Sequence, residues 1–340
     1  MDDRIIGVKI YDHQGPFEEL VSQWRSLGIN TVFSGLSLYS NNNFRSIIKS
    51  SGITSFVIVP IFFNPEILDV SPGLYAITDS GEKAQEEWVK FVCPSRMEYR
   101  RQKISEIENI IREFDPDGLS IDFIRHFVFW EKIYPDRFLS SLPNTCFDNS
   151  CLTGFQADNH LSIPDTLTET VEMADWVKEN HLDIWTNWKC NLITSMIEEI
   201  TVAAKKIKPN ISINIHIVPW AQDEFDGAIK IVTGQDLAAI SPFANYLSPM
   251  TYAHMVKQSP SWIHSIVQEM DHIAQNKIIP SIQVSDAYLN ELLNAMEFEE
   301  SLLESLKPPS HGVIFWSWEK LEQDPIKMKI LQSALTDENF

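Results

Sequence analysis

Eight short apolar segments of this chain alternate with amphipathic segments that have the periodicity of helices. The apolar segments lie at residues 4–11, 29–38, 53–63, 119–123, 211–218, 246–252, 278–284 and 311–318. Such runs are typical of parallel strands buried on both faces, and strands that alternate with helices build α/β folds. The glycine-rich phosphate loops of nucleotide enzymes do not occur in the sequence. The pattern therefore predicts a (β/α)8 barrel, formed as one domain by residues 1–340, in preference to a doubly wound sheet.

The predicted helices fit between these strands. They span residues 16–27, 43–50, 95–114, 185–208, 236–241, 262–275, 289–306 and 325–335. Residues 127–181 follow the fourth strand and are rich in aromatic residues, proline and asparagine. A connection of this length is unusual in a compact domain and generally marks a lid or the wall of a site. We therefore expect an irregular insertion that lies over the mouth of the barrel.

The charge of the chain limits its partners. A formal net charge of −20 argues against nucleic acid or an anionic membrane as a partner, because phosphates would be repelled. The charge is compatible with neutral sugars or with cationic ligands. No apolar run reaches the ~18 residues that a membrane helix needs, and no signal peptide is visible at the start. We therefore expect a cytoplasmic location.

Four cysteines are too few for a disulfide scaffold. Cys93 and Cys190 are expected to be isolated buried thiols. Cys146 and Cys151 share one loop, so they could pair or supply half of a metal site, but two ligands are too few for zinc. The histidines are scattered, with no His-x-His pair at a strand end. We therefore predict structural cysteines, no metal site and no cofactor.

The segment at residues 115–126 carries the strongest functional signal. It reads Asp-Pro-Asp-Gly-Leu-Ser-Ile-Asp-Phe-Ile-Arg-His and places Asp122 at the carboxyl end of the fourth predicted strand, followed closely by Arg125 and His126. In α/β barrels the chemistry is done at the carboxyl ends of the strands. A carboxylate there is costly to bury unless it is paired, so Asp122 is either a structural partner of Arg125 or a catalytic group.

Polar and aromatic residues also follow the other predicted strands and should converge on the same mouth. In residues 312–318 the period of a strand places Trp316 and Trp318 on one face, which we expect to face the barrel interior. Tryptophan rings in a cleft can stack on the faces of sugars. The predicted substrate-binding residues are Lys9, Asp12, Arg125, His126, His216, Trp220, Tyr252, Gln283, Trp316 and Trp318.

The fourth-strand segment resembles the corresponding motif of α-amylase-type glycoside hydrolases, Asp-Gly-Phe-Arg-Ile-Asp followed by Lys-His. The resemblance implies that Asp122 is a nucleophile and that His126 matches the family's histidine. Ser120 stands where the family has arginine, and residues 211–218 hold no counterpart of the family's acid/base glutamate.

Other segments are similar to family 18 chitinase-like barrels, which carry Met-x-Tyr on strand six and a tryptophan on strand eight. Residues 250–252 and 312–318 match these two elements, while Ile124 stands at the position of that family's catalytic glutamate. A further group of glycoside-hydrolase-like TIM barrels resembles the chain over residues 5–320. Its motifs match residues 93–95, 99–100, 122–125 and 248–250, and the resemblance implies a sugar-acting site.

Hydrolysis of a glycoside requires two carboxyl groups that flank the bond. Asp122 is predicted to be the first. The second could be Glu319 after the eighth strand, Glu224 in the acidic loop 223–226, or Asp12, and either His216 or Tyr252 could replace it as a proton donor. The sequence predicts a glycosidase with a carbohydrate substrate. A non-catalytic carbohydrate-binding barrel is the alternative, and a barrel enzyme of another class, such as a metal-dependent hydrolase or an aldolase using Lys9, is a third.

Overall fold

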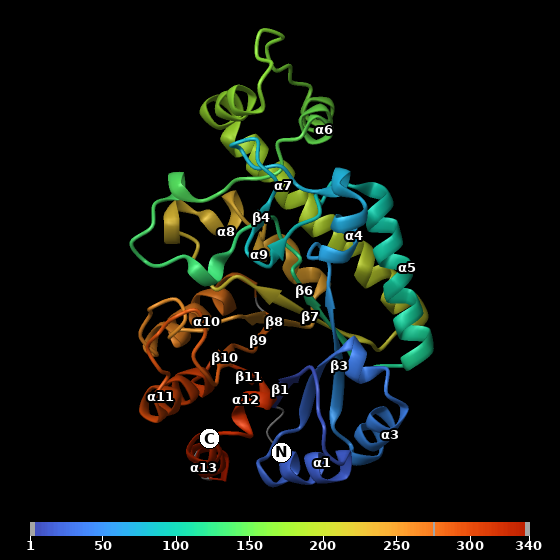
Figure 1. Ribbon diagram of the computed structural model, residues 1–340, viewed down its shortest axis with the longest axis vertical. Coiled ribbons are helices and arrows are strands. Elements are labelled where there is room, and N and C mark those ends of the chain that lie inside the picture. Colours follow the sequence, from blue (N-terminus) through green and yellow to red (C-terminus); the bar gives the residue numbers. More distant parts are fainter. Residues whose placement is uncertain (1–3, 275, 337–340) are drawn as a thin grey trace.

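The computed structural model describes residues 4–274 and 276–336, and a parallel sheet curled into a barrel lies at its centre (Figure 1). Its strands are β1 (Ile5–Ile10), β2 (Thr31–Gly35), β3 (Thr54–Pro60), β6 (Gly118–Asp122), β7 (Ser212–Ile217), β8 (Tyr246–Pro249), β9 (Lys277–Ile278), β10 (Ser281–Gln283) and β11 (Gly312–Trp316). They follow the order β10-β11-β1-β2-β3-β6-β7-β8-β9. A separate antiparallel hairpin consists of β4 (Gln85–Glu86) and β5 (Val89–Lys90).

The barrel has eight positions because β9 and β10 are two halves of one strand. The first half pairs with β8 and the second with β11. Between them, the Ile279 N–H donates to the carbonyl of Leu247 (2.9 Å), and the Ile314 N–H donates to the carbonyl of Pro280 (2.9 Å). Pro280 has no N–H of its own, which accounts for the break in the ladder. The seventh strand therefore closes the sheet, and the predicted (β/α)8 barrel is confirmed.

Helices surround the strands (Figure 1). They are α1 (Phe17–Ser26), α2 (Leu36–Tyr39), α3 (Asn42–Ser51), α4 (Pro65–Val70), α5 (Met97–Phe114), α6 (Asn149–Asn159), α7 (Thr170–Ile207), α8 (Ala228–Ile231), α9 (Leu237–Ile240), α10 (Ser261–Ala274), α11 (Ala295–Leu306), α12 (Trp318–Leu321) and α13 (Pro325–Thr336). Short 3-10 turns lie at Pro72–Leu74, Trp130–Lys132, Leu139–Ser141, Glu224–Asp226 and Ser241–Phe243. Helix α1 is typical: it buries Leu20, Val21 and Trp24 on one face and exposes its glutamates.

Large side chains fill the barrel interior below the mouth. Phe33 and Phe56 stack there with ring centroids 4.9 Å apart, and isoleucines from β3, β11 and the seventh strand pack around them. This packing requires glycine at the start of the fourth strand, because a Cβ on Gly118 would lie 2.2 Å from the Phe56 ring. The interior is a packed core up to the level of the mouth, so a ligand can enter only above it.

The insertion after β6 is more regular than predicted. Residues 127–181 include α6 and the first turns of α7, which begins at Thr170 rather than at residue 185. A reciprocal capping box between Glu169 and Glu172 starts this helix early, and a kink at His181 separates the unpredicted part from the predicted part. Figure 1 shows α6 and the start of α7 at one end of the molecule, away from the barrel strands.

Other element boundaries differ by a few residues. Residues 36–39, predicted to continue the second strand, form the short helix α2, and the helix predicted from residue 289 begins at Ala295, where Asn294 caps it. The predicted end of α10 at residue 275 lies outside the described residues. Within residues 4–274 and 276–336, no helix has both the length and the apolar composition needed to cross a membrane.

Candidate active site

A small cavity of about 180 Å³ lies at the carboxyl ends of the barrel strands. Strand residues form its floor, and residues 123–131 of the chain after β6 form part of its wall. Its lining consists of Lys9, Tyr11, Trp88, Asp122, Phe123, Arg125, Trp130, Glu131, Met250, Tyr252, Met255, Tyr288 and Trp316. Five of the predicted site residues therefore meet here: Asp122, Lys9, Arg125, Tyr252 and Trp316. We call this cavity the mouth pocket.

Asp122 is the last residue of β6, and its backbone holds it in the sheet. Its carbonyl accepts a hydrogen bond from the N–H of Ile61 (2.9 Å), and its Oδ1 accepts one from the N–H of Phe123 (2.7 Å). Phe123 has a φ of 50°, so the extended strand ends abruptly at this point. The carboxylate is consequently held at the rim of the sheet, where it lines the pocket.

A chain of hydrogen bonds runs from the pocket down into the barrel. The Lys9 Nζ donates to the Tyr252 hydroxyl (3.1 Å) and lies 3.4 Å from Nδ1 of His216, whose Nε2 lies 2.8 Å from Ser120 Oγ. Burial lowers the pKa of Lys9 to about 8, partly offset by the Asp122 charge. Burial and the neighbouring Lys9 together lower the pKa of His216 to about 3. His216 is therefore a neutral group below the pocket that helps to position Lys9.

Glu131 is the second acid of the pocket. Its side chain is buried, and Oε2 has no hydrogen-bond partner among the described residues. Burial raises the pKa of Glu131 to about 7, against the opposing effect of the Arg125 charge. A carboxyl group in this environment keeps its proton near neutral pH, which is the property of a general acid.

Arg125 is a fully buried cation between the pocket and the aromatic core. Its guanidinium donates to the carbonyl of Val128 (2.8 Å) and lies 4.8 Å from the Phe91 ring and 5.5 Å from the Phe123 ring. Burial lowers the pKa of Arg125, while the charges of Glu131 and Asp122 raise it. Arg125 thus fixes the path of the chain after β6 and places a positive charge near both acids.

Aromatic rings form the walls of the mouth pocket. Tyr252 and Trp316 stack with centroids 4.8 Å apart, and Trp130 lies against Tyr252 at 5.8 Å. At the rim, Trp88 Nε1 donates to the hydroxyl of Tyr288 (3.0 Å). Trp88 belongs to the hairpin after β3, and Tyr288 follows β10, so this hydrogen bond joins loops from the third and seventh of eight barrel positions. Walls of this kind suit the apolar face of a sugar ring.

His126 and Trp220 are predicted binding residues that lie buried away from the mouth pocket. His126 is buried behind the sheet, where its backbone N–H donates to Thr233 and its ring lies near Lys189, because the chain turns at Phe123. Trp220 is also buried and packs edge-on against Phe225.

Trp318 does not face the interior as predicted. The strand ends at Trp316 and helix α12 begins at Trp318, so the alternation of a strand does not extend to it. Its ring packs at 90° against Trp24 of α1, with centroids 5.7 Å apart, and is fully buried. Trp318 is therefore a core residue between the sheet and α1.

The remaining predicted residues support loops or lie in other hollows. Gln283 accepts from the N–H of Met255 (2.8 Å) and so holds a lining residue. Glu319 accepts from the backbone N–H groups of Tyr11 and Asp12, and it thereby shapes the loop after β1. Asp12 is exposed and bonds to its own loop. Glu224 lies beside Trp220 in a separate small hollow, where burial raises its pKa.

The pocket also contains residues that the sequence did not single out. They are Tyr11, Trp88, Phe123, Trp130, Glu131, Met255 and Tyr288. The only signal that could have found Glu131 was its place in an aromatic-rich insertion directly after a strand bearing an acid. The expectation that this insertion forms a site wall pointed to the right region but to no particular residue.

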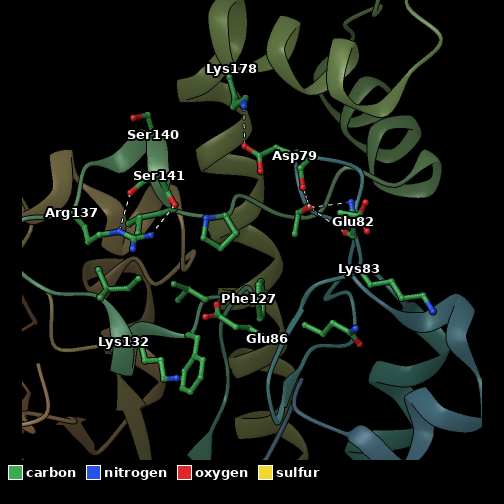
Figure 2. A pocket seen from close by; sticks show the side chains of 18 of the residues that line it. Asp79, Glu82, Lys83, Glu86, Phe127, Lys132, Arg137, Ser140, Ser141 and Lys178 are labelled. Atoms are coloured by element: carbon green, nitrogen blue, oxygen red, sulfur yellow. Dashed lines mark hydrogen bonds and ion pairs between the residues drawn. The ribbon is translucent and has the colours of Figure 1, made fainter. Parts of the chain in front are cut away.

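A larger, more open hollow of about 580 Å³ lies between residues 78–86 and the insertion (Figure 2). Several of its charged groups are engaged with neighbouring residues. Lys178 Nζ lies 2.9 Å from an oxygen of Asp79, and Arg137 donates to Ser141 (3.2 Å) (Figure 2). The mouth pocket is the better candidate for chemistry, because it combines two acids, buried cations and aromatic walls.

The raised pKa of Glu131 predicts a pH dependence of stability. The unfolded carboxyl ionises near 4.5 and the folded one near 7, so the folded state binds the extra proton between these values. The contribution of Glu131 to the free energy of unfolding should therefore fall as the pH rises through this window, by on the order of 3 kcal/mol in all. Glu131→Gln should remove this dependence.

The measurement is urea unfolding of the wild type and of the Glu131→Gln variant between pH 4.5 and 8. The variant should gain stability relative to the wild type as the pH rises, with the gain levelling off above pH 7. A difference between the two proteins that stays constant over this range would show that the environment of Glu131 does not raise its pKa.

Comparison with known proteins supports the fold. Neither a protein-family profile nor a curated protein matches the sequence. Among solved structures, the glycoside hydrolase domain of PgaB (BpsB) from Bordetella bronchiseptica is similar with a TM-score of 0.71 and 11% identity, covering 98% of each chain. The β-galactosidase from Marinomonas ef1 is similar with a TM-score of 0.72 and 9% identity. The α-L-fucosidase isoenzyme 2 from Paenibacillus thiaminolyticus is similar with a TM-score of 0.62 and 11% identity.

The present chain covers nearly all of the PgaB domain but only part of the two larger enzymes. The alignment with the galactosidase covers 97% of the present chain and 58% of the galactosidase. The alignment with the fucosidase covers 98% of the present chain and 49% of the fucosidase. At such low sequence identities, the structural similarity shows a shared barrel fold and nothing further. The finer resemblance to family 18 and α-amylase-type barrels stays a prediction.

Proposed function

We propose that the chain is a glycoside hydrolase that works in the mouth pocket. The observation that carries the proposal is the pairing of two acids in different environments, Asp122 at the strand end and Glu131 buried with a raised pKa. Glycosidases need such a pair, one carboxyl group to donate a proton and one carboxylate to act at the sugar. The three structural neighbours named above, each described as a glycosidase or a glycoside hydrolase domain, support this reading.

In the proposed mechanism Glu131 is the general acid. It donates its proton to the glycosidic oxygen as the bond from this oxygen to the anomeric carbon breaks, so that the leaving group departs as an alcohol. Asp122 acts from the sugar side, either by attacking the anomeric carbon or by activating the water that attacks it. Lys9 and Arg125 stabilise the negative charge of Asp122 electrostatically. Water finally supplies the new hydroxyl group of the sugar.

The size and walls of the pocket support a carbohydrate of limited bulk. A volume of about 180 Å³ is below the ~300–1,000 Å³ of typical ligand pockets, so we propose that a single sugar unit enters. Tyr252 and Trp316 offer stacked rings to its apolar face, and Lys9 offers a donor to its hydroxyl groups. The proposal places this chemistry in the cytoplasm, as expected from the sequence, since four buried cysteines that form no disulfide suit a reducing compartment.

The test is a hydrolysis screen. The purified chain is incubated with 4-nitrophenyl glycosides of common hexoses, deoxyhexoses and amino sugars, and with oligosaccharides whose new reducing ends are measured. We expect nitrophenol or reducing-end release from at least one substrate. An Asp122→Asn sample, purified in the same way, controls for contaminating host glycosidases. Saturable sugar binding by calorimetry without hydrolysis of any substrate would instead support the non-catalytic carbohydrate-binding barrel.

A further inference from the structure

Three cysteines and one aspartate meet where the segment before α5 contacts the insertion, in a group we call the cysteine cluster. Cys93 comes from the segment before α5, while Cys146, Asp148 and Cys151 come from the insertion. One ligand atom from each lies within 4.8 Å of the other three, and the three cysteines are buried. The prediction that Cys93 is an isolated thiol is therefore wrong, because its sulfur lies 3.2 Å from that of Cys151, more than 50 residues along the chain.

The spacing of these atoms suits a tetrahedral metal ion. Zinc binds thiolate sulfurs at ~2.3 Å and carboxylate oxygens at ~2.0–2.2 Å, which places the ligand atoms of one ion roughly 3.5–3.8 Å apart. In the cluster the sulfurs of Cys93 and Cys151 are 3.2 Å apart, and the sulfur of Cys146 is 3.3 Å from Oδ2 of Asp148. The four groups need only small adjustments to surround one ion. We propose that this cluster is a zinc site with Cys93, Cys146, Cys151 and Asp148 as its ligands.

The surroundings of the cluster support metal binding. Three thiolates and a carboxylate around Zn²⁺ leave a net charge of −2, and the Arg96 guanidinium, 2.5 Å from Oδ2 of Asp148, offsets part of it. The Ile77 N–H donates to the sulfur of Cys146 (3.2 Å), and the Ser95 hydroxyl lies 3.1 Å from the sulfur of Cys151. Donors around the ligand atoms are the usual outer shell of a structural metal site.

A disulfide explains the cluster less well. A bond between Cys93 and Cys151 would use two of the sulfurs and leave the sulfur of Cys146 and the carboxylate of Asp148 without a role in the same small volume. Four protein ligands leave no open position for water or substrate, which is the mark of a structural zinc rather than a catalytic one. The proposed ion would tie the insertion, and with it Glu131, to the segment that follows the third barrel strand.

The experiment measures zinc in protein purified under reducing conditions with zinc in the medium. We expect about one zinc ion per chain by elemental analysis and a matching adduct in native mass spectrometry. Replacing zinc with Co²⁺ should give thiolate-to-cobalt charge-transfer bands and the strong visible bands of a tetrahedral site. The Cys93→Ser and Cys146→Ser variants should hold less than about a tenth of the wild-type zinc.

Two further variants distinguish the loss of a zinc ligand from a failure of the variant to fold. Cys190→Ser is the matched control, since Cys190 is buried and free but lies outside the cluster, and it should keep its zinc. Asp148→Asn retains an N-cap for α6 but loses the anionic ligand, so it should fold and bind zinc at least about tenfold more weakly.

Two results would overturn the proposal. One is wild-type protein that stays free of metal after incubation with zinc and dialysis under reducing conditions. The other is a Cys93–Cys151 disulfide found by peptide mapping of the protein as it is isolated from cells. Neither result depends on glycosidase activity, so the zinc site can be refuted without refuting the proposed function, and the reverse also holds.

Discussion

The Asp122→Asn variant is expected to lose about a thousandfold or more of kcat/KM on any glycoside that the wild type hydrolyses. Asparagine has the shape of aspartate and still offers an oxygen to the N–H of Phe123, so the strand end should be preserved. It has no negative charge with which to attack or to activate water. Circular dichroism and the melting temperature should stay close to those of the wild type.

The matched control for this variant is Asp223→Asn. Asp223 is an exposed carboxylate in the acidic loop after β7, outside the mouth pocket, so its change should alter kcat/KM by less than about twofold. If Asp122→Asn keeps near-full activity on a confirmed substrate, Asp122 is not the group that acts at the sugar, and the proposed function loses its central residue.

The Glu131→Gln variant should show a loss that depends on the leaving group. A natural sugar leaving group needs a proton, so its hydrolysis should slow by about a hundredfold or more without the acid. A 2,4-dinitrophenolate leaves without protonation, so the variant should hydrolyse a dinitrophenyl glycoside at a rate much closer to that of the wild type. The measurement is kcat/KM for a series of aryl glycosides whose phenols differ in pKa.

The pH profile gives the same variant a second readout. A general acid must be protonated, and the pKa of Glu131 is about 7, so wild-type kcat/KM should decline as the pH rises above this value. Glu131→Gln should lack this decline. Glu224→Gln is the matched control, because Glu224 is a half-buried glutamate whose pKa burial also raises, but it lies outside the mouth pocket. Equal losses for good and poor leaving groups would rule out Glu131 as the proton donor.

The fold was predictable because its strands are short, apolar and regularly spaced. Burial on both faces leaves a strand such as Thr54–Pro60 apolar from Phe56 onward, and this is visible in the sequence without any knowledge of the neighbouring strands. Prediction failed where a local signal competes with periodicity. Helix α7 starts at Thr170 because of a capping box, and residues 36–39 turn into a helix directly after β2.

The site was predictable only for residues near the carboxyl ends of strands, where barrel enzymes place their chemistry. Asp122, Lys9 and Tyr252 lie at or near strand ends, and the barrel brings them together. Glu131 is nine residues beyond its strand, in a segment whose path depends on Arg125 and on aromatic packing, which no short pattern encodes. The prediction for Trp318 was wrong for the opposite reason. It extended the alternation of the strand past Trp316, although a helix begins at Trp318.

The hydrogen bond between Trp88 and Tyr288 bears on which part of a saccharide can reach the acids. It connects loops on opposite sides of the eight-stranded ring, and both residues line the pocket, so it forms a strap across the opening. A long polymer lying across the barrel would meet this strap before its internal linkages reached Asp122. A terminal unit could be inserted beside it. For the proposed glycoside hydrolase, a closed strap would favour removal of sugars from chain ends over cleavage within the chain.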